Sequence, residues 1–140
     1  PTILESISEA TSQTRNIILI TEHVRGRLSR QISDMNENDQ GFIPLVTLTP
    51  QWEQVFAESL VGQGEDRQLS LAPSALQDFI NALRTTFERQ AMMGETPVLL
   101  TSPAIRPYVR SIVERFRPMT VVMSQNEVYP KAKIKTVGQI

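Results

Sequence analysis

The 140-residue sequence contains no cysteine, which excludes disulfide bonds, thiolate catalysis and cysteine-based zinc sites. It contains one histidine, His23, so acid–base chemistry near neutral pH would depend on that residue alone. Its 14 basic and 15 acidic residues leave a net charge of −1, which gives no reason to expect nucleic acid or an anionic membrane as a partner. The longest apolar run is Ile17–Ile20, far short of the roughly 18 residues that cross a bilayer.

What is present is typical of a globular protein, with 40% apolar and 21% charged residues. Apolar residues at helical spacing over residues 2–12, and again over about 15–32, predict two amphipathic helices in a hairpin. The polar stretch at 33–41 ends in glycine and is the best boundary in the chain. We therefore expect part of a helical subdomain over 1–40 and a C-terminal α/β subdomain over 41–140.

Strand and helix patterns alternate through the second part. Strands are expected at 45–48, 98–101, 120–123 and 132–137, and helices at about 50–60, 73–93 and 103–116. The βαβ unit at 98–123 requires two parallel strands, whereas the last strand, which alternates apolar and basic residues, can pair antiparallel at an edge. The predicted fold class is therefore α+β or α/β: a helical hairpin, then a small α/β subdomain with a mixed sheet in the order β-α-α-β-α-β-β.

Two strand-to-helix junctions carry a hydroxyl residue followed by proline, Thr49-Pro50 and Ser102-Pro103, which predicts Thr49 and Ser102 to be structural N-caps. A serine at such a junction can also be an exposed nucleophile or part of a phosphate site. A nucleophile elbow needs glycines around the serine, and Pro103 removes a backbone N–H that a phosphate would use. A small-ligand or phosphate-binding α/β domain using residues 101–103 is the alternative hypothesis.

No other pattern indicates catalysis, a metal or a cofactor. His23 lies off the apolar stripe of its helix, with no acidic residue spaced to suggest a catalytic triad. The stretch DMNEND at 34–39 resembles a calcium loop, but its glycine and closing glutamate are out of register. We expect no catalytic residue, no metal and no cofactor.

Arginines gather on two of the predicted helices: Arg25, Arg27 and Arg30 on the hairpin, and Arg106 and Arg110 on the helix at 103–116. The last two are spaced i, i+4 and share a face beside the apolar stripe. Arginine is enriched at protein interfaces, so we expect these five to be exposed and to bind a partner. The alternative is that their stems pack while their charged ends stay in water. A nucleic-acid reader would need a more basic chain with interleaved aromatics.

Three stretches carry a resemblance to a known family: TEHVRGRLSR at 21–30, PVLLTSPAIRP at 97–107, and SQNE at 124–127 before a basic strand. In this order they resemble the C-terminal end of the cytoplasmic domain in the FlhA/InvA family of flagellar and type III secretion export-gate proteins. The resemblance covers nearly the whole chain. None of the three stretches is a catalytic motif.

The resemblance implies that this chain, which starts at Pro1 without methionine, is a fragment of an integral membrane protein. In that family a cytoplasmic region forms a homo-oligomeric ring on the cytoplasmic side of the bacterial inner membrane. The region docks export chaperone–substrate complexes and other export-apparatus proteins, and it is not known as an enzyme. The hairpin would help to build ring contacts, and the α/β part would contribute a wall of the docking cleft.

Overall fold

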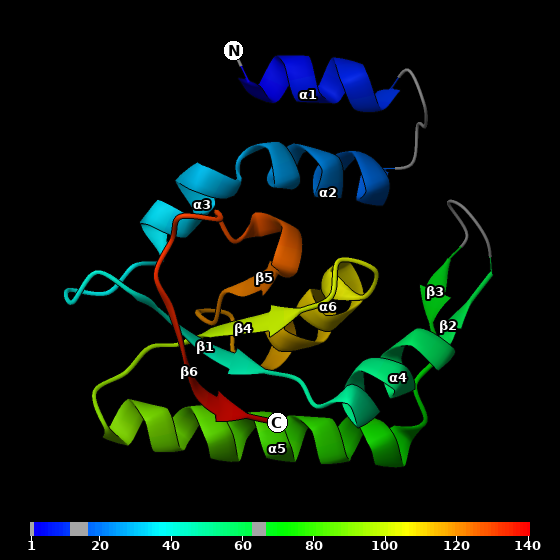
Figure 1. Cartoon of the computed structure of the whole chain (residues 1–140). Coiled ribbons are helices and arrows are strands. Elements are labelled where there is room, and N and C mark those ends of the chain that lie inside the picture. The colour runs from blue at the N-terminus through cyan, green and yellow to red at the C-terminus, as the bar shows by residue number, and fades with distance from the viewer. Residues whose placement is uncertain (1, 12–16, 63–66) are drawn as a thin grey trace.

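The computed structural model describes residues 2–11, 17–62 and 67–140 (Figure 1). The helical part consists of α1 (Thr2–Thr11), α2 (Ile17–Arg27) and α3 (Ser29–Met35). The α/β part that follows consists of β1 (Ile43–Thr47), α4 (Pro50–Glu58), β2 (Leu60–Val61), β3 (Gln68–Leu69), α5 (Pro73–Met92), β4 (Val98–Thr101), α6 (Arg106–Phe116), β5 (Val122–Ser124), the short 3₁₀ helix η2 (Gln125–Glu127) and β6 (Ile134–Gln139). The fold class and element order expected from the sequence are confirmed, with the small β2–β3 pair as an addition.

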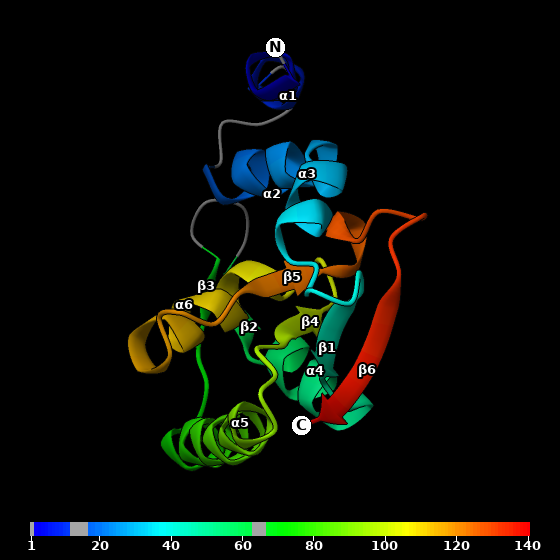
Figure 2. The same ribbon diagram turned by 90° about the vertical axis from the view of Figure 1, so that its left-hand side faces the viewer.

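A parallel sheet in the order β5-β4-β1-β6 forms the centre of the molecule, and β2 and β3 form a separate antiparallel pair. Figure 2 shows α2 and α3 above the sheet and the long helix α5 below it. Side chains alternate between the two faces because successive strand residues point in opposite directions. Val46, Leu99 and Val122 join a core with α4, α5 and α6, whereas Leu45 and Met123 face the second side, where Ile32 of α3 packs.

The expected antiparallel pairing of the last strand is wrong. β6 runs parallel to β1, with Ile43 opposite Ile134 and Thr47 opposite Gln139. The connection at 125–133 is long enough to cross the second face of the sheet and to bring the chain back to the end at which the strands begin. Parallel pairing requires this return. All pairs in the four-stranded sheet are therefore parallel, and β2–β3 is the one antiparallel pair among the described residues.

The long helix expected at about 15–32 is divided into two helices, α2 and α3. Residues 15 and 16 of the expected helix lie outside the described residues. The helix is interrupted at Leu28, which has φ −101° and ψ 18° and separates α2 from α3. Gly26 lies just before this break, and glycine has a low helix propensity. Helix α3 runs to Met35, so the polar boundary stretch begins inside a helix, and Ser33 is buried rather than part of a loop.

Candidate functional site

A chain of four alternating charges joins the helical part to the α/β part. Arg25 of α2 binds the Glu127 carboxylate through two nitrogens, with Nη2 2.9 Å from Oε1 and Nε 3.0 Å from Oε2. Arg106 at the start of α6 contacts the same carboxylate, with Nε 3.3 Å from Oε1. Its Nη1 donates to Oε2 of Glu22 on α2 at 2.8 Å. We call these four residues the ion cluster.

Local structure around η2 directs Glu127 into this position. Ser124 and Glu127 form a capping box, in which the serine side chain accepts the backbone N–H of Glu127 and the glutamate accepts the backbone N–H of Ser124. The Glu127 side chain is only 1% exposed. A carboxylate this deeply buried needs cationic partners, and the two arginines supply them.

Arg106 is buried rather than exposed on the surface of its helix. It is 3% exposed, and its Nε donates to the carbonyl oxygen of Val122 at 3.0 Å. The expectation that Arg106 belongs to an exposed interface rim is therefore wrong. The helix begins at Arg106 instead of at residue 103, so the side chain of its first residue reaches back under β5.

Burial is the largest influence on the pKa values of Glu22 and Arg106. Desolvation raises the pKa of Glu22 above its ordinary value even though Arg106 opposes the shift. Desolvation likewise lowers the pKa of Arg106, with Glu127 and Glu22 opposing it. The cluster balances two positive against two negative groups, and its energy depends on all four being present.

A second polar connection runs beside the cluster. The buried hydroxyl of Ser33 donates to the carbonyl oxygen of Glu127 at 2.8 Å and accepts the backbone N–H of Tyr129 at 2.8 Å. Arg30 lies over the Tyr129 ring, 5.9 Å from its centroid. Helix α3 is thereby fixed to the segment that follows η2.

The predicted partner-binding arginines divide into two groups. Arg25 and Arg106 both bind the carboxylate of Glu127, so their charged ends have internal partners. Arg27, Arg30 and Arg110 are exposed and lie outside the cluster, and Arg110 pairs with Glu114 on its own helix at 3.3 Å. Sequence reasoning missed Glu22, Ser33 and Glu127 as residues that connect the helical part to the α/β part. The spacing of Ser124 and Glu127 matches a capping box and could have identified that pair.

The two predicted caps have different outcomes. Thr49 is the N-cap of α4, and its side chain accepts the backbone N–H of Trp52 at 3.3 Å. Ser102 is not a cap, because α6 begins at Arg106 and its N-cap is Ile105. Instead, the backbone N–H and the hydroxyl of Ser102 both donate to the carboxylate of Glu53 on α4, at 2.9 and 2.8 Å.

The ion cluster unites the three stretches that the sequence singled out. Glu22 and Arg25 come from 21–30, Arg106 from 97–107, and Glu127 from 124–127. The arrangement can hold two parts of a protein at a defined angle, because each ionic group is matched by a partner of opposite charge. Within the described ranges no group of three histidine, cysteine, aspartate or glutamate residues could hold a metal ion. In the same ranges, no helix is both long and apolar enough to span a bilayer.

Comparisons with known proteins identify the family of this chain. The model of the FHIPEP family matches residues 1–133. The flagellar biosynthesis protein FlhA of Caulobacter vibrioides is 56% identical over 140 residues, which are 100% of this chain and 20% of that protein. The chain therefore spans about a fifth of the length of the curated relatives it matches.

Solved structures show the same fold. The Chlamydia pneumoniae CdsV and CdsO protein complex matches with a TM-score of 0.88 at 32% identity, over 99% of this chain and 41% of that chain. The nonameric EPEC SctV-C structure from cryo-EM matches with a TM-score of 0.86 at 22% identity, again over 99% and 41%. These matches confirm the resemblance that the three stretches indicated, and the chain belongs to the FHIPEP family.

Proposed function

We propose that this chain is a non-enzymatic interaction module, the C-terminal part of the cytoplasmic domain of a flagellar or type III export gate. In this proposal residues 1–40 belong to a helical subdomain and residues 41–140 form the last α/β subdomain. The parent protein is anchored in the bacterial inner membrane, forms a ring on its cytoplasmic side, and docks export chaperone–substrate complexes and other export components.

The observation that carries the proposal is the convergence of the three family stretches on the ion cluster. These stretches supply Glu22, Arg25, Arg106 and Glu127, whose charges are satisfied inside the protein. Residues used in this way position one part of a scaffold against another. The relatives support the assembly: one solved neighbour is a complex of CdsV with CdsO, and another is nonameric.

Within this proposal, partner contacts fall to the exposed arginines. Arg27 and Arg30 on the helical part and Arg110 on α6 present charged ends at the surface. Arg25 and Arg106 instead position the surfaces, because their guanidinium groups bind Glu127 and Glu22. The two groups of arginines therefore differ in what their substitution changes.

The test measures binding of purified export chaperone–substrate complexes to this chain and to its ring-forming parent domain by isothermal titration calorimetry. Charge reversal at Arg27, Arg30 or Arg110 is expected to weaken binding or ring assembly while the protein stays folded, because surface contacts such as the Arg110–Glu114 pair contribute little stability. Arg84→Glu on the exposed side of α5 is the matched control. Unchanged affinity and unchanged assembly in all three variants would remove these residues from the proposal, and absence of binding to both proteins would overturn it.

The alternative function at the 101–103 junction receives no support from the geometry. The two donors of Ser102 that would hold a phosphate are occupied by the carboxylate of Glu53. A second anion at this position would meet that negative charge at close range. We therefore propose no ligand site there.

A further inference from the structure

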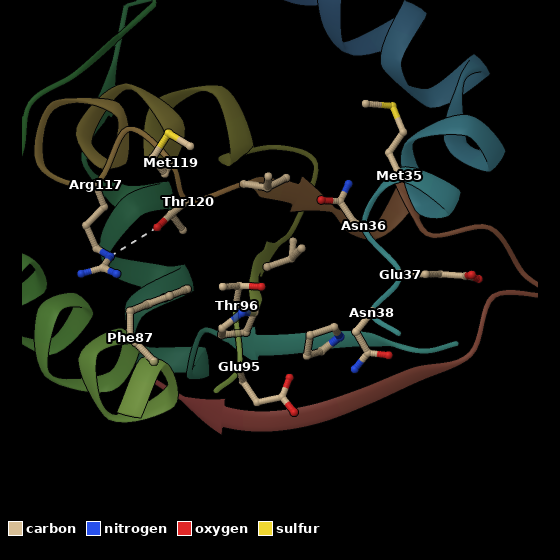
Figure 3. A pocket seen from close by; sticks show the side chains of 15 residues that line it. Met35, Asn36, Glu37, Asn38, Phe87, Glu95, Thr96, Arg117, Met119 and Thr120 are labelled. Carbon is tan, nitrogen blue, oxygen red and sulfur yellow. Dashed lines mark hydrogen bonds between the residues drawn. The ribbon is translucent and has the colours of Figure 1, made fainter. Parts of the chain in front are cut away.

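A groove of about 290 Å³ opens at the edge of the sheet where β1, β4 and β5 begin (Figure 3). One wall comes from the end of α3 and the residues that follow it. The others come from the end of α5 with the turn before β4, and from the connection between α6 and β5. The groove lies between the end of α3 and the α/β part, and it shares no residue with the ion cluster.

Exposed methionines surround this edge of the molecule. Four of the five methionines in the chain are strongly exposed: Met35 by 82%, Met92 by 89%, Met93 by 63% and Met119 by 93%. Met35 and Met119 line the groove and lie on two sides of it (Figure 3). Methionine is flexible and polarizable, so it adapts to apolar partners of different shape. Large apolar side chains gathered at a surface are typical of a binding site.

Two acidic side chains against one arginine give the lining of the groove a negative balance. Glu37 and Glu95 line it, and in the part of the chain that the structure describes neither carboxylate has an ion-pair or hydrogen-bond partner. The ends of α3 and α5 and the C-cap of α6 line the same groove, so their C-terminal dipoles add partial negative charge.

Arg117, the one cation among the described residues that line the groove, already has partners. Arg117 lies over the Phe87 ring, 5.5 Å from its centroid, and donates to Oγ1 of Thr120 at 3.3 Å. These three residues occupy the opposite end of the groove from Glu37 (Figure 3). Lys135 on β6 lies over the ring of Phe42, 5.6 Å from its centroid. Neither cation pairs with Glu37 or Glu95, so both carboxylates can accept a cation from a partner.

We propose that this groove binds a short amphipathic, basic segment of a partner protein. An apolar side chain of that segment enters between Met35 and Met119, and a flanking lysine or arginine lies beside Glu37 or Glu95. The charge selects the occupant, because an anionic lipid surface or an acidic segment would meet the two carboxylates with repulsion. The inference rests on the proposed function, since it names a surface and a partner chemistry for the same interaction module.

The first experiment follows the methionine methyl groups of the whole 140-residue chain by NMR with ¹³C-methyl labelling. The probe is a synthetic amphipathic helix of leucine and lysine, and the matched probe replaces every lysine with glutamate. We expect saturable shifts of the Met35 and Met119 signals with the lysine peptide, weaker binding at higher salt, and no shift of buried Met123. Equal binding of the two peptides, or shifts that rise linearly without saturation, would overturn the proposal.

Variants assign the binding to the groove. Met119→Ser is expected to weaken the lysine peptide about tenfold because an apolar contact is lost, and Glu95→Gln about two- to fivefold because one exposed charge is lost. Met92→Ser and Glu88→Gln are matched controls, since both residues are exposed on α5 and neither lines the groove. Equal losses in the controls would contradict a groove-specific site.

Two further outcomes separate this inference from the proposed function. If export chaperone–substrate complexes bind the chain and the groove variants leave that affinity unchanged, the groove inference is overturned while the proposed function stands. If those complexes fail to bind but the lysine peptide shows the full variant pattern, the proposed function fails and the groove remains a site for basic segments. Concentration-dependent shifts of Met35 and Met119 without any peptide would identify a second copy as the occupant and overturn the inference.

Discussion

Arg106 and Glu127 are 21 positions apart in the chain, yet Nε of the arginine lies 3.3 Å from Oε1 of the glutamate, and both side chains are at most 4% exposed. The pair is bracketed by two residues of α2, Arg25 on the glutamate and Glu22 on the arginine. The helical part is therefore held to the α/β part through charge as well as through apolar packing. This arrangement makes the joint sensitive to single substitutions that remove one charge.

Glu127→Ala is expected to lower the free energy of unfolding by about 3–5 kcal/mol, because it leaves Arg106 buried without its central partner. Urea denaturation followed by circular dichroism measures the change. Glu114→Ala is the control, since the Glu114–Arg110 pair is exposed and its loss costs about 0.5 kcal/mol. Equal effects of the two substitutions would show that the buried cluster contributes no more than a surface ion pair.

The raised pKa of Glu22 predicts a pH dependence of stability. Its ordinary value is 4.5, and burial raises the pKa in the folded protein, so the folded state binds this proton more tightly than the unfolded state. The stability that this proton contributes is therefore fully present below about pH 4.5 and is lost as the pH rises through the higher folded value.

Glu22→Gln removes this titration, so the difference in unfolding free energy between wild type and variant should decrease with rising pH and then become constant. Arg106 also loses the carboxylate that it pairs with, which adds a constant offset, so the slope alone carries the test. Urea titrations at closely spaced pH values measure it. A difference that increases with pH would mean that the pKa of Glu22 is lowered, contrary to the burial argument.

Local signals explain which features could be predicted from the sequence. The cap at Thr49 depends on residues three positions apart, and the long stripe of α5 repeats over many turns, so both were predictable. The direction of β6 depends on the path of the connection at 125–133 across the sheet, which no periodicity encodes.

The candidate site was predictable only in part, because its contacts join distant positions. Arg25 meets Glu127 across 102 positions, and Ser102 meets Glu53 across 49. The i, i+4 relation of Arg106 and Arg110 suggested a common exposed face on the assumption that the helix began at residue 103. Because it begins at Arg106, that first residue turns inward, and the residue type alone carried no sign of its burial.

The pairing of Ser102 with Glu53 predicts a structural role that substitution can separate from ligand binding. Ser102→Ala removes the 2.8 Å hydrogen bond to the carboxylate and is expected to cost about 1–2 kcal/mol of unfolding free energy. Glu53→Gln removes the charge that fills the position of an anion. Phosphate added to either variant should leave its melting temperature unchanged. A concentration-dependent rise for the wild type, abolished in Ser102→Ala, would instead revive the ligand hypothesis.

Gly26 and Gly41 should respond in opposite ways to substitution by alanine. A Cβ added at Gly26 in α2 would meet no atom within 4 Å, so Gly26→Ala should stabilise the protein by about 0.5–1 kcal/mol through helix propensity and a less flexible unfolded chain. Gly41 also has open space but a φ of +84°, which alanine adopts at a cost, so Gly41→Ala should destabilise by about 1 kcal/mol. Thermal unfolding of both variants compares backbone conformation with space as the limiting factor. A destabilised Gly26→Ala would show that the break at Leu28 requires glycine before it, and that the orientation of α2 on the ion cluster depends on this flexibility.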